Sequence, residues 1–146
     1  MDKHIRMDRA LNHFIEKLKD KVGDRLVATV LFGSSAREDC DESSDLDLLI
    51  IVEKYDDIES FLIDLCVEII MDHGVSIAPL VWDINDFEAN ILHKSPLFLT
   101  LLLGYTIWYD KTNFFRNKLR AIKKEEIPEF TFVGRQKEWR SSEILL

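Results

Sequence analysis

Two aspartates, Asp45 and Asp47, stand at the start of an apolar run that ends at Val52. Because side chains alternate along a strand, both carboxylates are expected on the same face. Two like charges at that separation repel each other, and a divalent cation that prefers oxygen ligands relieves the repulsion. The pair is therefore a candidate Mg²⁺ site, although an isolated Asp-x-Asp is more often the solvated beginning of a strand.

A glycine–serine turn, Gly33-Ser34, follows a second apolar run, Leu26 to Phe32. Where a strand stops at glycine and the chain turns into a helix, free backbone N–H groups can hold an anion, and glycine lets a phosphate approach them closely. Ser34 adds a hydroxyl donor, and Arg37, about one turn further on, adds positive charge. Such a turn alone indicates structure more than function. Followed by two aspartates, it predicts a site for phosphates and metal.

Hydrophobic patterns predict the elements that hold these residues. An N-terminal helix with apolar residues three and four apart ends at Gly23. A broad apolar face that includes Val67 and Ile70 predicts a helix over 55–73, and Pro79 suggests that the strand over 75–82 lies at an edge or carries a bulge. Further segments read as strands at 26–32, 45–52 and 106–109, and as helices after Asp83 or Asn85, from Pro96 to Gly104 and over 114–124. The alternation indicates an α/β (α+β) fold, a small mixed sheet with helices packed on it.

The order and spacing of the two motifs resemble those of a known superfamily. Gly33-Ser34-Ser35-Ala36-Arg37 precedes Ser44-Asp45-Leu46-Asp47-Leu48, and this arrangement is similar to the signature of the DNA polymerase β-like nucleotidyltransferases. The likeness is greatest to the minimal nucleotidyltransferase (MNT) branch, and it covers roughly residues 27–52. The resemblance implies the nucleotidyltransferase fold and transfer of a nucleoside monophosphate, with AMP from ATP as the expected case, to a hydroxyl acceptor.

The resemblance also assigns expected roles to individual residues. Asp45 and Asp47 would be the catalytic carboxylates and would bind Mg²⁺, with a two-ion site as one arrangement. Gly33 and Ser34 would hold the β- and γ-phosphates of a nucleoside triphosphate. Arg37 and Ser44 would complete the nucleotide-binding set. Minimal members often act beside a helical HEPN-domain protein as antitoxin and toxin, which implies a HEPN-type partner.

One departure from the family pattern leaves a second function open. Active members of the superfamily usually supply a third carboxylate from a later strand, and the candidate strand over 75–82 contains no acid. Asp72 precedes that strand and Asp83 follows it, and neither is expected to face the site. The alternative is therefore a catalytically impaired binding module that keeps the nucleotidyltransferase fold without transferring a nucleotide.

Composition and charge limit the classes of protein to which the chain could belong. The chain has 146 residues, a net charge of −8 and 47% hydrophobic residues, which is typical of a globular domain. No apolar run could span a bilayer and no signal peptide is visible, so we expect a cytoplasmic protein without membrane contact. The overall acidity disfavours nucleic acid as a partner. Cys40 and Cys66 indicate neither a disulfide framework nor a zinc site, and His4, His13, His73 and His93 lack metal-ligand spacing and are expected at the surface or at helix ends.

Charge is distributed unevenly along the chain. Thirteen Asp or Glu and one basic residue lie between positions 38 and 72, whereas nine Lys or Arg and four Glu lie between positions 111 and 140. This split fits either ordinary solvated faces or an acidic centre that attracts cations beside a basic arm. We expect a nucleotidyltransferase domain over 1–127 and a C-terminal arm over 128–146 that packs on the domain or on a partner. Homo-oligomer formation is left open.

Overall fold

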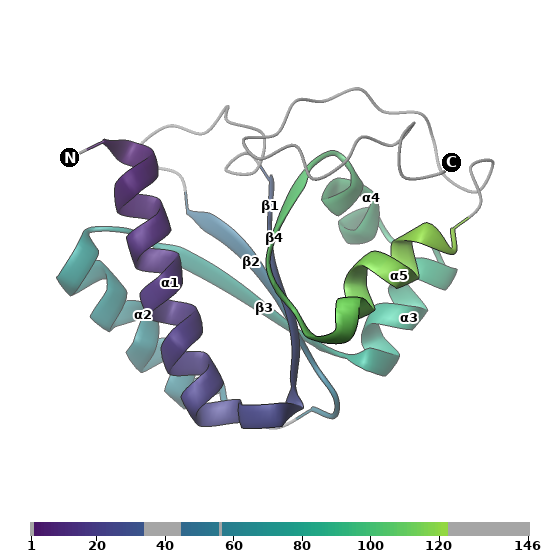
Figure 1. Cartoon of the computed structure of the whole chain (residues 1–146), viewed down its shortest axis with the longest axis horizontal. Coiled ribbons are helices and arrows are strands. Elements are labelled where there is room, and N and C mark those ends of the chain that lie inside the picture. The colour runs from purple at the N-terminus through teal and green to yellow at the C-terminus, as the bar shows by residue number, and fades with distance from the viewer. Residues whose placement is uncertain (1, 34–44, 56, 123–146) are drawn as a thin grey trace.

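A four-stranded mixed sheet lies at the centre of the computed structural model, which describes residues 2–33, 45–55 and 57–122 (Figure 1). The spatial order of the strands is β3-β2-β1-β4; β2 and β3 are parallel, and the other neighbours are antiparallel. The predicted fold class, a mixed sheet with helices packed on it, is confirmed. The elements in chain order are α1 Lys3–Val22, η1 Gly23–Arg25, β1 Leu26–Phe32, β2 Leu46–Val52, α2 Glu59–His73, β3 Ile77–Asp83, α3 Ile84–Leu92, α4 Pro96–Leu102, β4 Tyr105–Asp110, η3 Lys111–Asn113 and α5 Phe114–Arg120.

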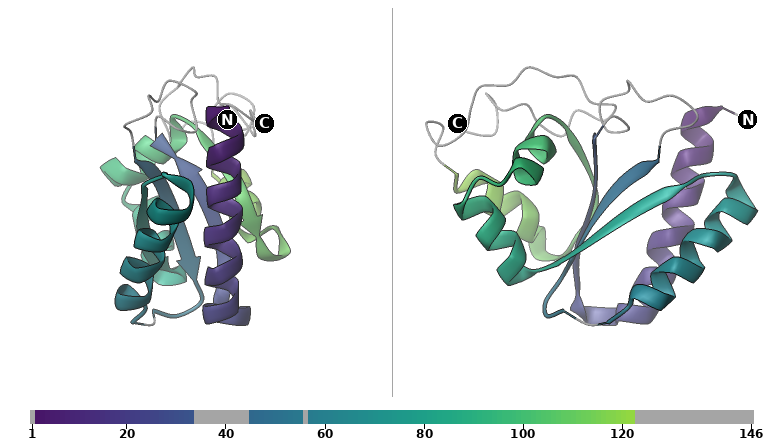
Figure 2. Two further views of the ribbon diagram at one scale, coloured as in Figure 1. Left: turned by 90° about the vertical axis from the view of Figure 1, so that its left-hand side faces the viewer. Right: turned by 180° about the vertical axis from the view of Figure 1, so that it is seen from behind.

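Helices cover both faces of the sheet. α1 and α2 lie on one face, and α3, α4 and α5 lie on the other (Figures 1 and 2). Two separate apolar cores result, one on each side of the sheet. All seven residues of β1 are buried because this central strand has neighbours on both edges and helices on both faces.

The N-terminal helix follows from its sequence. Asp2 caps α1, because its side chain accepts hydrogen bonds from the backbone N–H groups of the first turn. The predicted stripe of residues at 11, 14, 15, 18 and 22 is buried against the sheet. Gly23 ends the helix at a φ of 65°, as predicted, in a region that favours glycine.

The parallel strand β3 forms one edge of the sheet, as Pro79 suggested. The backbone N–H of Leu46 donates to the carbonyl of Ser76 at 2.9 Å. Because backbone groups alternate in direction along a strand, the even-numbered residues of β3 turn their hydrogen-bonding groups toward β2. Pro79, which has no N–H, therefore occupies a position that faces the open edge, and no ladder bond is lost.

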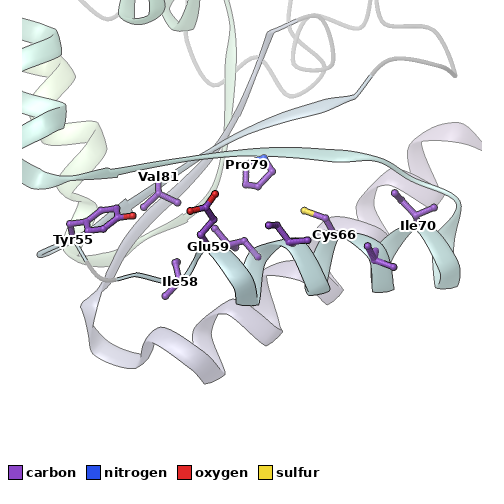
Figure 3. A pocket seen from close by; sticks show the side chains of 10 residues that line it. Tyr55, Ile58, Glu59, Cys66, Ile70, Pro79 and Val81 are labelled. Atoms are coloured by element: carbon purple, nitrogen blue, oxygen red, sulfur yellow. The ribbon is translucent and has the colours of Figure 1, made fainter.

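The outer face of α2 corrects part of the sequence interpretation. Leu62, Leu65 and Ile69 are buried, but Val67 and Ile70, which we expected on the packed face, expose 54% and 47% of their surface. They line an apolar groove of about 490 Å³ between α2 and β3 (Figure 3). α2 is apolar on more sides than the sheet can cover, so hydrophobic periodicity alone did not identify its buried side.

None of the helices in the described ranges is long and apolar enough to cross a membrane.

Candidate active site

The candidate residues meet at one end of the sheet. β1 and β2 pair antiparallel with Phe32 opposite Asp47, so the last residue of β1 and the first residues of β2 lie side by side. β3 runs parallel to β2, and its N-terminal end lies at the same edge, with Ala78 opposite Asp47. Gly33, immediately after β1, is thereby placed beside the acidic pair, although eleven residues separate it from Asp45 in the sequence.

Gly33 lies directly against the side chain of Asp47. Its φ is 75°, in the left-handed region that L-residues with side chains seldom adopt. A Cβ atom added at this position would lie 2.5 Å from the Oδ2 atom of Asp47, well inside van der Waals contact. The backbone conformation therefore favours glycine here, and any side chain would require the carboxylate of Asp47 to move. Gly33, immediately after β1, and Asp47, near the start of β2, are thus in direct contact.

Asp47 faces the layer of helices α3 to α5. Its strand neighbours Leu49 and Ile51 belong to the core on that side, whereas Leu46 and Leu48 belong to the core under α1 and α2. Asp45 immediately precedes β2, and its charge lies close enough to Asp47 to affect that carboxylate. That both carboxylates share one face stays a prediction.

The electrostatic environment of Asp47 is unfavourable for its negative charge. Asp47 is half-buried and Asp45 is exposed. Burial, which removes water from the carboxylate, raises the pKa of Asp47, and the nearby negative charge of Asp45 raises it further. A bound divalent cation would offset both effects. Two carboxylates with open positions for water and phosphate oxygens are a ligand set that fits Mg²⁺.

A third carboxylate is missing from this edge in the part of the chain that the structure describes. The residue opposite Asp47 on the neighbouring strand is Ala78, which shares its side of the sheet with Leu80 and Trp82. Asp83 lies at the far end of β3, opposite Val52, where it caps α3. Within the described ranges, no group of three or more metal-ligating side chains includes Asp45 or Asp47.

Three residues of the predicted site, Ser34, Arg37 and Ser44, lie outside the described residues, and so does the predicted C-terminal arm over 128–146. Of the predicted set, the structure brings together Gly33, Asp45 and Asp47. The sequence alone did not show that Ala78 is the residue opposite Asp47 on β3. Only the register of β3 against β2 identifies it.

A family model for the nucleotidyltransferase domain matches residues 11–140, and the chain belongs to this family. The match extends well beyond the two motifs and includes all four strands of the sheet.

Two curated relatives come from Methanocaldococcus jannaschii. The protein named "Putative protein adenylyltransferase MJ1305" is 34% identical over 146 residues, covering 95% of this chain and 97% of the relative. The protein named "Putative protein adenylyltransferase MJ0604" is 38% identical over 74 residues, covering 51% of this chain and 71% of the relative.

Solved structures with similarity to this chain include one described as a toxin–antitoxin with AMP-PNP. The matching chain is 15% identical, the TM-score is 0.46, and the match covers 68% of this chain and 73% of that chain. Another is a tri-AMPylated Shewanella oneidensis HEPN toxin in complex with MNT antitoxin. The matching chain is 16% identical, the TM-score is 0.42, and the match covers 74% of this chain and 75% of that chain.

Proposed function

We propose that this protein is a Mg²⁺-dependent nucleotidyltransferase that moves AMP from ATP to a hydroxyl group on a protein. The observation that carries the proposal is the contact between the Gly33 turn and Asp47, where an added Cβ would lie 2.5 Å from the carboxylate oxygen. A turn suited to phosphate and a pair of carboxylates suited to metal adjoin each other at the end of the sheet. The similarity to relatives named as protein adenylyltransferases supports ATP as the donor and a protein as the acceptor.

Each residue contributes through position and charge. Gly33 leaves space beside the backbone for the carboxylate of Asp47, and Asp45 and Asp47 would hold the metal. Mg²⁺, when bound, would neutralise charge on the triphosphate and fix its orientation. The acceptor oxygen forms a bond to the α-phosphorus, the bond from that phosphorus to the bridging oxygen of pyrophosphate breaks, and the proton of the hydroxyl passes to solvent. Catalysis of this kind depends mainly on alignment and electrostatics, so few side chains are needed.

The exposed groove between α2 and β3 favours a protein as the partner. Ile63, Val67, Ile70 and Met71 expose between 47% and 78% of their surface on one helix. Exposed apolar patches that adjoin a groove commonly mark surfaces for other proteins. A helical HEPN-type protein, implied by the resemblance of the motifs to minimal nucleotidyltransferases, is the first candidate for the acceptor.

A second function, nucleotide binding without transfer, is favoured by one observation. Ala78 stands opposite Asp47, where a neighbouring strand could have supplied a third carboxylate. In this alternative the two aspartates and Gly33 bind Mg²⁺ and nucleotide, and the protein acts through its partner alone.

Labelled ATP separates the two functions. The protein is incubated with Mg²⁺, a lysate of the organism that encodes it and ATP labelled at either the α- or the γ-phosphate. Relative to the lysate alone, the nucleotidyltransferase predicts added label on protein from the α-phosphate and no added label from the γ-phosphate, and Asp45→Asn should add neither. Equal added α-label with both proteins would contradict transfer, and so would no added label with either. If neither protein adds label but the parent still binds Mg-ATP, the binding module is the correct function.

A further inference from the structure

A second group of metal-ligating side chains lies between α1 and α2, on the face of the sheet opposite Asp47. His13 comes from the middle of α1, and Glu68 and Asp72 come from the second half of α2. Each of the three offers one ligand atom, and these atoms all lie within 4.8 Å of one another. We expected His13 and His73 at the surface or at helix ends, and His73 is the last residue of α2. His13 instead lies mid-helix and is part of a polar cluster.

Both ring nitrogens of His13 have partners. Its Nε2 atom is 2.6 Å from Oε2 of Glu68, and its Nδ1 atom is 2.9 Å from Nε2 of His73. The two rings meet edge to face, with centroids 5.1 Å apart. The packing of two helices therefore fixes the orientation of the His13 ring, while 24% of its side chain remains exposed.

This arrangement has the form of a metal ligand with its supporting residue. If Nε2 of His13 binds a cation, Nδ1 carries the proton and donates it to His73. Histidines that bind metal almost always donate the second ring N–H to an acceptor, which fixes the tautomer and the ring orientation. In the cluster, His73 supplies that acceptor.

The two carboxylates complete a ligand set for a transition metal. Glu68 and Asp72 are four residues apart, so they project from one face of α2, one turn apart. Their two negative charges match the charge of a divalent cation. One imidazole and two carboxylates, with water in the fourth position, is a set that suits Zn²⁺ at ligand distances of about 2 Å. The side chain of Glu68 is 42% exposed. An ion can therefore reach it from solvent, and the side chain has room to rotate toward that ion.

We propose that His13, Glu68 and Asp72 bind a divalent transition metal, with Zn²⁺ as the representative ion, and that His73 is a positioning residue. The site joins α1 to α2 and is independent of the Asp45/Asp47 pair. A metal held by both helices stabilises the folded chain, because the unfolded chain does not bring these residues together.

The test uses Zn²⁺ alone on the full chain that carries both Asp45→Asn and Asp47→Asn, so that the candidate active site cannot respond. Titration calorimetry should show one saturable site, and Tm should rise with zinc concentration. His13→Gln and Asp72→Asn should each weaken binding by about a hundredfold or more. Two variants are used because His13 is partly buried and its replacement could impair folding, whereas Asp72 is exposed.

Two further variants separate specific binding from general attraction. Asp20→Asn removes one negative charge from an exposed position on α1 and should leave zinc affinity unchanged. His73→Gln should lower affinity about tenfold to a hundredfold while the Tm of the metal-free protein stays the same. Failure of the background protein to bind zinc saturably, or equal binding by His13→Gln and Asp72→Asn, would overturn the proposal. Neither result would bear on nucleotide transfer.

Discussion

At the scale of single residues, Gly33 and Asp47 restrict each other. Gly33 has a positive φ, and its absent side chain leaves room for the carboxylate of Asp47. Asp47 in turn carries a charge that burial and Asp45 both disfavour. A half-buried carboxylate with a raised pKa beside a like charge adds nothing to the stability of a metal-free fold. Under the proposed function, a bound cation would offset this cost.

The first prediction concerns Gly33→Ala. The methyl group would meet Oδ2 of Asp47 at 2.5 Å, so the turn or the carboxylate must move. We expect a loss of stability greater than the roughly 1 kcal/mol typical of alanine at a positive φ, together with weaker nucleotide binding. Chemical denaturation measures the former and calorimetry the latter.

Gly74→Ala is the matched control for this change. Gly74 has a φ of 68°, but nothing lies within 4 Å of a Cβ atom at its position. It should show the cost of the positive φ alone and leave nucleotide binding intact. Equal destabilisation by the two substitutions would show that the contact with Asp47 has no energetic weight.

Asp47→Asn should stabilise the metal-free protein. The folded-state pKa of Asp47 is raised above the ordinary value of 3.8, so ionisation costs stability as the pH rises above that value. The amide removes this cost. In the presence of a chelator at pH 7 we expect a Tm increase of about 1–3 °C, and the difference should disappear below the ordinary pKa. A lower Tm for the variant at pH 7 would show that the carboxylate stabilises the fold without metal.

At the scale of elements, α2 serves two surfaces. Its inner side packs under the sheet through residues such as Leu65 and Ile69, and its outer side lines the apolar groove beside β3. Both sides of the helix are apolar, so they differ in how deeply their side chains are buried and not in composition. The same helix also carries two carboxylates of the proposed metal cluster near its C-terminal end.

Two isoleucines on α2 provide a matched test of this division. Ile69 is fully buried and Ile63 is 58% exposed. Ile69→Ala should cost about 2–5 kcal/mol because it leaves a cavity, whereas Ile63→Ala should cost less than about 1 kcal/mol. Urea denaturation measures both. Similar costs for the two would mean that the outer face of α2 is covered in the protein in solution.

The start of α3 depends on Asp83. Its side chain accepts a hydrogen bond from the backbone N–H of Asp86 at 2.7 Å, and the side chain of Asp86 accepts one in return from the backbone of Asp83. Asp83→Ala should therefore cost about 1 kcal/mol. Because this cap lies at the opposite end of β3 from Ala78, nucleotide affinity should not change; reduced affinity would contradict the position assigned to the site.

Elements that local signals define were predicted from the sequence, and those that depend on long-range packing were not. The predicted bounds of β1 match the structure, because an apolar run between a helix end and Gly33 has only one plausible reading. Alternation alone predicts Asp45 and Asp47 on one face. The position of Ala78 required the register between β2 and β3, and the contact of His13 with Glu68 spans 55 residues. Neither leaves a pattern in a single sequence.

At the scale of the whole molecule, two layers of helices leave one end of the sheet for the site. The C-terminal end of β1 meets the N-terminal ends of β2 and β3 there, while packed helices cover both faces of the sheet (Figures 1 and 2). The proposed transition-metal cluster is on the α1–α2 side and Asp47 faces the other. The chain would thus carry two metal sites of different chemistry, one of oxygen ligands alone and one that includes imidazole.

The most direct test of the central claim is nucleotide binding by thermal shift, with and without Mg²⁺, on the parent and on Asp45→Asn. The account predicts that ATP raises the Tm of the parent only when Mg²⁺ is present, and that Asp45→Asn loses this increase while folding normally. An equal increase in both proteins, or none with any triphosphate, would contradict a Mg²⁺–nucleotide site at Gly33, Asp45 and Asp47.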